Sequence, residues 1–128
     1  MTYEERVEQS RTHIVKAVFP NTTNHYDTLF GGNALQWMDE VAFIAATRFS
    51  RQKMVTVSSD PIDFNHPIHA GTLVELVGEI VKVGSSSLKV NVKVYMEEMY
   101  SDVRELAIEG HFTLVAIDDD KRPVKILM

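Results

Sequence analysis

Residues 31–49 read GGNALQWMDEVAFIAATRF, and this stretch decides the fold. At about 100° per residue, its apolar side chains gather on one wide arc of a helix. The arc consists of Leu35, Met38, Ala42, Ala45, Ala46 and Phe49, and it continues through Ala34, Trp37, Val41 and Ile44. The polar wedge is narrow and consists of Asn33, Gln36, Glu40 and Thr47. The pattern therefore predicts one long helix that is buried over most of its surface.

The segments around this helix have the pattern of β-strands. Residues 12–18 form a first strand that Pro20 ends, and residues 20–29 form a polar loop. Alternating apolar and polar residues predict later strands over 54–59, 72–83, 87–95 and 104–117, with an irregular extended stretch over 62–68. This order predicts the α+β class, with an antiparallel sheet of about five strands wrapped around the helix in a single domain, residues 1–128. A second copy of the chain would cover the exposed edge of such a sheet.

The composition restricts the class of function. The chain has no cysteine, which excludes a disulfide framework, a zinc ribbon and a thiol nucleophile, and which fits a reducing compartment. The net charge of −5 disfavours nucleic acid as a partner. No apolar stretch is long enough to span a membrane, and no apolar signal-peptide core follows the polar first residues. We therefore expect a cytoplasmic protein that binds neither nucleic acid nor membrane.

Asp39 is the most informative residue for chemistry, because its helical angle places it inside the apolar arc. Burying a carboxylate without a partner costs on the order of several kcal/mol. One interpretation places Asp39 at the edge of the arc, where it meets solvent or a partner chain. The other makes it a carboxylate at the wall of a site, with a pKa tuned by burial.

Gly31 and Gly32 open the helix and form a second candidate feature. The free N–H groups at a helix N-terminus stabilise negative charge, and glycine lets a ligand approach the backbone. These donors could hold an oxyanion. A plain turn from loop to helix explains the same two residues.

Other polar residues are weaker candidates. His66 and His69 flank Pro67 without a cysteine or acidic partner, so no metal site is expected. The residues Gly84, Ser85, Ser86 and Ser87 form a hairpin turn whose hydroxyls and N–H groups could bind a phosphate. Lys82 and Lys89 nearby would suit an anionic group. The pattern favours a plain hairpin turn for the first four residues, and the two lysines are equally ordinary as solvated strand positions.

Residues 24–42, NHYDTLFGGNALQWMDEVA, resemble the signature of hotdog acyl-CoA hydrolases, most closely the bacterial broad-specificity and brain-type group. That signature has an Asn, then Phe or His before Gly-Gly, then Met-Asp-Glu and small residues along a helix. Further stretches resemble the same group: residues 55–57 with 63–64 and 67–68, residues 78–87, and residues 112–118 with 122–123. The resemblance covers residues 12–124. One departure is Asp27, where this group commonly has glycine.

The resemblance implies a hotdog fold and the hydrolysis of acyl-CoA thioesters to free CoA and a carboxylic acid, without a bound cofactor. It implies a homodimer with two sheets joined edge to edge and two sites at the interface, and such dimers often assemble as trimers. Asp39 would act as general base or nucleophile, Asn24 of the other chain would orient the water or thioester, and Gly31 or Gly32 would bind the carbonyl oxygen. The substrate-binding residues would be Phe30, Asp63, Phe64, Lys82, Lys89 and the turn Gly84, Ser85, Ser86 and Ser87.

Two other functions remain open. A hotdog hydratase or dehydratase needs a His base at the head of the helix, yet no histidine lies between His25 and His66. A non-catalytic acyl-CoA-binding domain would keep the fold without turnover.

Overall fold

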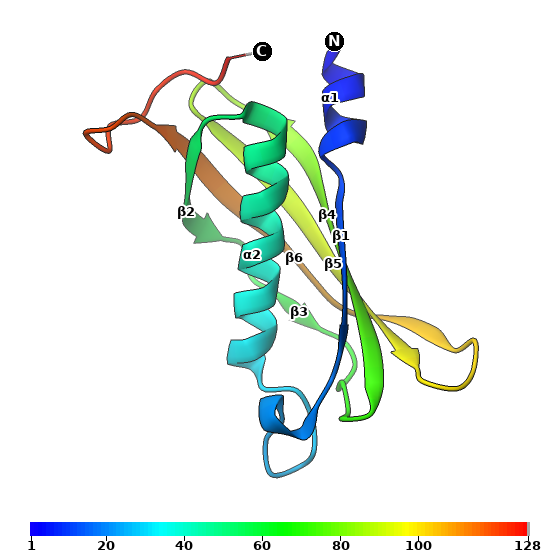
Figure 1. Ribbon diagram of the computed structural model, residues 1–128. Helices are drawn as coiled ribbons and strands as arrows, with labels where there is room; N and C mark the ends of the chain where they lie inside the picture. Colours follow the sequence, from blue (N-terminus) through cyan, green and yellow to red (C-terminus); the bar gives the residue numbers. More distant parts are fainter. Residues whose placement is uncertain (128) are drawn as a thin grey trace.

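A computed structural model describes residues 1–127, so that Met128, the last residue of the predicted domain, lies outside the described residues (Figure 1). The elements in chain order are α1 (Tyr3–Ser10), β1 (Thr12–Ala17), the short 3-10 helix η1 (Pro20–Thr22), α2 (Gly31–Ser50), β2 (Lys53–Ser59), β3 (Asp63–Phe64), β4 (Thr72–Val83), β5 (Ser87–Glu98) and β6 (Arg104–Ile117).

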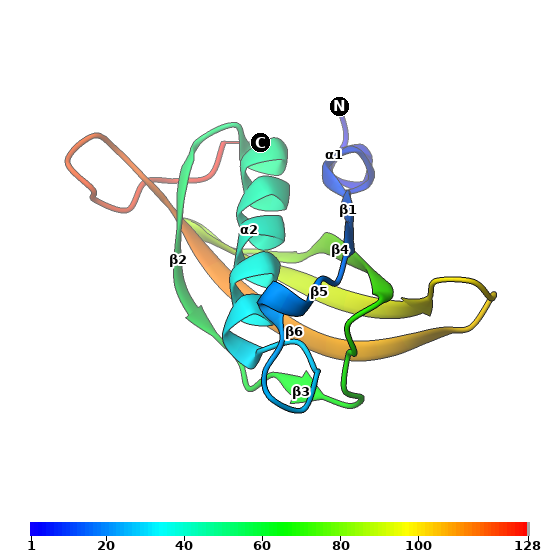
Figure 2. The same cartoon turned by 60° about the horizontal axis from the view of Figure 1, so that its bottom comes forward.

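The strands form one antiparallel sheet in the order β1-β4-β5-β6-β2. The two-residue β3 also pairs with β6, through Asp63 opposite Glu109 and Phe64 opposite Ile108. Strand β3 therefore pairs with β6 on the same side as β2 does. Figure 2 shows the sheet curving around α2, with β2 rising beside the helix. The predicted α+β class and the five-stranded hotdog sheet around a central helix are confirmed.

Small residues let α2 pack closely on the sheet. Its buried side chains are Ala34, Met38, Val41, Ala42, Ala45, Ala46 and Phe49, together with Ser50. The contact is closest at Gly78 of β4, where a Cβ atom would lie 2.7 Å from Cγ1 of Val41. Glycine is needed there because any side chain would separate the helix from the strand.

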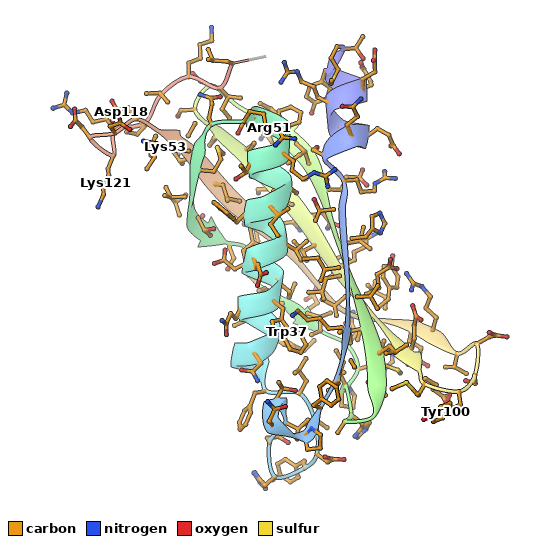
Figure 3. The ribbon with its side chains drawn as sticks, in the orientation of Figure 1. Trp37, Arg51, Lys53, Tyr100, Asp118 and Lys121 are labelled. Atoms are coloured by element: carbon orange, nitrogen blue, oxygen red, sulfur yellow. The ribbon has the colours of Figure 1, made fainter. Side chains whose placement is uncertain are left out.

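The prediction that α2 is buried over most of its surface is wrong for the single chain. Leu35 and Phe43 are 39% and 46% exposed. Trp37 is only partly buried, and the ammonium of Lys16 on β1 lies over its ring, 5.1 Å from the centroid (Figure 3). The apolar side of α2 toward β2 therefore lacks a cover within the chain.

Helix α1 was not predicted from the sequence, although Thr2 and Glu5 carry the signal for its start. The Thr2 hydroxyl accepts from the Glu5 amide and the Glu5 carboxylate accepts from the Thr2 amide, which is a capping box. The helix covers the end of α2, where the Tyr3 ring meets the Phe49 ring edge-on at 6.0 Å. Among residues 1–127, no helix is long and apolar enough to cross a membrane.

Candidate active site

A groove of about 570 Å³ runs between the N-terminal half of α2 and β2. Its lining residues are Gly32, Leu35, Gln36, Asp39, Thr56, Val57, Ser58, Ser59 and Phe112. The structure thus brings two of the predicted catalytic residues, Gly32 and Asp39, to one surface. The groove is open to solvent in the single chain.

Asp39 lies at the edge of the buried face of α2 and is exposed in the single chain. The Thr56 hydroxyl donates to Oδ1 of Asp39 at 2.7 Å. Within residues 1–127, Oδ2 accepts no hydrogen bond from another side chain or amide, and Asp39 lines the groove. Asp39 therefore lies at the edge of the apolar arc and also in the wall of a groove, so neither interpretation excludes the other, and its catalytic role stays a prediction.

Thr56 is a site residue that the sequence analysis missed. It lies in the predicted strand 54–59, but the sequence does not show which residue of that strand faces Asp39. The pairing of β2 with β6 sets that position, since Thr56 lies opposite Leu114 just before a register shift in the ladder. An exposed threonine between two apolar residues was the only local signal.

The start of α2 presents open backbone donors. Phe30 precedes the helix and provides no side-chain cap. Within residues 1–127, the amides of Gly31, Gly32 and Asn33 have no acceptor, as expected for a first turn. Neither glycine has a positive φ, and a Cβ atom on either would meet nothing within 4 Å. The glycines therefore leave space above free N–H groups, which is the arrangement that binds an anion.

Asn24 lies in the loop before α2 and does not line the groove of its own chain. Its Oδ1 accepts from the amides of Tyr26 and Thr28, at 2.9 and 3.2 Å, and from the Thr28 hydroxyl at 3.0 Å. These donors fix the orientation of the side-chain amide, so that its NH₂ group is the part available to a ligand. Asp27 has φ 61°, and it adopts the left-handed backbone that its place in the signature requires.

Of the three other residues predicted beside the substrate, Phe64 lines a second pocket, of about 270 Å³. The other lining residues are Thr28, Leu29, Ala34, Asn65, His66, Pro67, Ile68 and Ile108. Phe30 and Asp63 are exposed and line neither the groove nor this pocket.

The predicted CoA-binding turn lies at the other end of the helix. The amide of Gly84 donates to the carbonyl of Ser87 at 2.7 Å, and the carbonyls of Ser85 and Ser86 accept from Ile126 and Ala116. The carbonyl of Lys125 in the C-terminal segment also accepts a hydrogen bond from the side chain of Gln52, just past the end of α2. A helix of 20 residues separates this turn from Gly31, so one chain does not bring them together.

The two predicted lysines are neighbours across β4 and β5, where Lys82 and Lys89 lie directly opposite each other. Nζ of Lys89 is 3.1 Å from the Asp60 carboxylate, while Lys82 is exposed. Asp60 directly follows the groove residues Ser58 and Ser59, so this ion pair links the lysines to the end of the groove.

As for metal ions, residues 1–127 contain no cluster of three His, Cys, Asp or Glu side chains that could hold one.

Residues 26–102 match the model of the thioesterase superfamily, and the chain belongs to that family. A relative from Bacillus subtilis, the uncharacterized acyl-CoA thioester hydrolase YkhA, is 39% identical over 93% of this chain and 69% of its own. The acyl-CoA hydrolase of Bacillus cereus superposes with a TM-score of 0.91 at 37% identity, covering 94% of this chain and 73% of that chain.

The acyl-CoA hydrolase of Staphylococcus aureus, solved with butyryl coenzyme A and coenzyme A, has a TM-score of 0.89 at 32% identity, over 94% of this chain and 73% of that chain. That enzyme was also solved with single alanine substitutions of an asparagine, an aspartate and a threonine that are 15 and 17 residues apart. Asn24, Asp39 and Thr56 have the same separations in this chain. A further structure, TM-score 0.91 at 35% identity, is a hexameric acyl-CoA thioesterase.

Proposed function

We propose that this chain hydrolyses acyl-CoA thioesters to free CoA and a carboxylic acid. The observation that supports it most directly is the Asp39 carboxylate, held by the Thr56 hydroxyl in a groove that also receives Gly32 from the open start of α2. A fixed carboxylate can activate water, and helix N-terminal amides can hold the oxyanion that water attack creates. The names of the relatives support the acyl-CoA substrate.

The reaction follows from these positions. Oδ2 of Asp39 takes a proton from water, whose oxygen attacks the thioester carbonyl carbon. The carbonyl oxygen becomes negative and accepts hydrogen bonds from the amides of Gly31 or Gly32. The C–S bond then breaks, and the leaving thiolate takes the proton from Asp39. In the alternative route, Asp39 attacks the carbon itself, and water cleaves the resulting acyl-aspartate anhydride. Neither route needs a bound cofactor or metal ion.

We propose that the working unit is a homodimer joined through β2. Among the described residues, β2 pairs only with strand β6, so its other edge is free. Val55 and Val57 on this edge are 40% and 56% exposed, and the exposed Leu35 and Phe43 lie beside them on α2. Pairing two such edges satisfies the backbone and covers the apolar side chains. The hexameric relative supports a further assembly of three dimers.

An antiparallel pairing of two β2 edges would complete the site. The two α2 helices would then run in opposite directions, so the C-terminal end of one would lie near the start of the other. The partner would supply Asn24, whose free NH₂ orients the water or thioester, and its turn Gly84–Ser87. That turn, with Lys82 and Lys89, would hold the CoA end, while Phe30, Asp63 and Phe64 would line the path of the substrate.

The lack of cysteine fits a reducing compartment, and we propose that the protein works in the cytoplasm.

The substrate class is tested by measuring free thiol release from a panel of saturated acyl-CoA esters, with a 2-enoyl-CoA assayed in parallel for hydration. The proposal predicts thiol release from the saturated esters. Hydration of the enoyl-CoA without thiol release would instead establish a hydratase. Binding of CoA esters without any turnover would establish a non-catalytic binding domain.

A further inference from the structure

The groove and the second pocket lie in line beneath the same segment of chain, residues 58–68. Ser58 and Ser59 line the groove, and the pocket begins at Phe64. Along β6, Phe112 lines the groove and Ile108 lines the pocket, with Gly110 midway between them. Gly110 lies two strand residues, roughly 7 Å, from each of them, so the two spaces are separated by the layer of side chains that packs on Gly110.

Ile62 and Met38 form that layer. A Cβ atom at Gly110 would lie 3.0 Å from Cγ1 of Ile62 and 3.3 Å from Cε of Met38, so both side chains rest on the glycine. Met38 is fully buried and directly precedes Asp39 on α2. Ile62 is partly buried against the core and lies between the groove residues and Phe64. Neither Ile62 nor Met38 lines either space in the structure.

The walls on both sides suit an acyl chain. The groove presents Leu35, Val57 and Phe112 beyond the carboxylate, and the pocket presents mainly Leu29, Phe64, Pro67, Ile68 and Ile108. An alkyl chain that starts at the thioester and runs away from Asp39 toward Gly110 reaches the partition first. Beyond the partition it finds an apolar space that no side chain of the described residues fills.

We propose that Ile62, seated with Met38 on Gly110, is the partition that sets the acyl-chain length, and that the pocket of Phe64 and Ile108 receives the chain end when the partition opens. This inference rests on the proposed thioesterase function. It makes Ile62 a specificity-determining residue that leaves the reacting atoms untouched. A short chain ends in the groove, whereas a long chain must displace Ile62.

The test compares kcat/KM for butyryl-, octanoyl- and palmitoyl-CoA in the full-length chain. Ile62→Ala should raise the ratio of palmitoyl to butyryl turnover by about tenfold or more, since methylene-sized changes in an apolar pocket have effects of that order. Ile62→Val should give a smaller rise in the same ratio. This milder variant takes the place of Ile62→Ala in the test if the alanine variant folds poorly. Ile44→Ala removes the same atoms at a half-buried position of α2 that lines neither space, and its ratio should equal that of the wild type.

The double variant Ile62→Ala with Phe64→Trp tests where the end of the acyl chain lies. A larger side chain in the pocket should abolish the gain for palmitoyl-CoA, so that the palmitoyl-to-butyryl ratio returns to the wild-type value. A gain that persists would show that the chain end lies elsewhere and would overturn the pocket assignment. An unchanged ratio in both Ile62 variants would overturn the partition alone, whereas the absence of thiol release from every ester in the wild type would overturn the proposed function as well.

Discussion

At the scale of single residues, one hydrogen bond organises the groove. The Thr56 hydroxyl donates a hydrogen bond to Oδ1 of Asp39, and Oδ2 has no partner among the described residues. The sequence analysis found Asp39, Gly31 and Gly32 because each breaks a local rule: a carboxylate on an apolar face and two glycines at a helix start. Thr56 breaks no local rule, since threonine is ordinary in a strand. Only the three-dimensional position of β2 beside α2 identifies it.

Replacing Thr56 by valine removes the donor and keeps the shape of the side chain. We expect kcat to fall about 10- to 100-fold, as for the loss of a hydrogen bond to a charged group, with KM little changed. Thr56→Ser keeps the hydroxyl and should retain most of the activity in the same steady-state thiol-release assay. Equal activity of the valine and serine variants would show that the hydroxyl does not position Asp39.

At the scale of elements, the sequence predicted the strands better than the connections. The strands 72–83 and 104–117 match the structure residue for residue, because a regular apolar alternation marks each of them. The strand predicted over 87–95 continues to Glu98, since Met96 and Glu97 pair with Glu105 and Arg104 of β6. The extended stretch 62–68 contains only β3, whose two residues pair with β6 at a position that tertiary structure alone determines.

The outer face of the sheet has a charge network that predicts pH-dependent stability. Glu75 on β4 accepts from Nη2 of Arg104 at 2.7 Å and lies 3.2 Å from Nδ1 of His13. The hydrogen bond from Arg104 lowers the pKa of Glu75 below its ordinary value of 4.5, against the opposing effect of burial, and His13 lowers it further. A lowered folded-state pKa stabilises the fold fully above pH 4.5, and this stabilisation is lost as the pH falls through the lowered value.

Glu75→Gln should therefore have a lower Tm than the wild type near neutral pH, and the difference should shrink as the pH falls below 4.5. Thermal unfolding followed by circular dichroism across this range measures it. Glu98→Gln changes an exposed carboxylate at the end of β5 and serves as the control. A Tm difference that is the same at every pH would show that ionisation of Glu75 contributes nothing.

For the molecule as a whole, the proposed site is incomplete within a single chain. Its groove is open on one side, its β2 edge is free, and the predicted CoA-binding turn lies at the far end of α2 from the glycines. The sequence predicted that a second copy is needed, because a five-stranded sheet with one helix leaves an edge exposed. It could not predict which edge, since strand order depends on contacts between distant residues.

Val55→Glu places a charge on the free edge of β2, outside the residues that line the Asp39 groove. We expect the mass in solution to fall toward the 14.5 kDa of one chain, because the edge can no longer be buried in a dimer. Light scattering after size exclusion measures this. Val81→Glu, at a similarly exposed valine on the inner strand β4, should leave the mass of the assembly unchanged. Dissociation by Val81→Glu with an intact Val55→Glu assembly would place the interface elsewhere.

The proposed reaction requires that the carboxylate of Asp39, in the groove that also receives Gly32 from the open start of α2, performs the hydrolysis. It is tested most directly by the rate of thiol release from butyryl-CoA for Asp39→Asn, measured beside Glu40→Gln, which neutralises the next carboxylate on the exposed side of α2. We predict that Asp39→Asn lowers kcat by about 10²- to 10⁴-fold with CoA-ester binding and Tm retained, while Glu40→Gln keeps the wild-type rate. A wild-type rate in folded Asp39→Asn would contradict the claim.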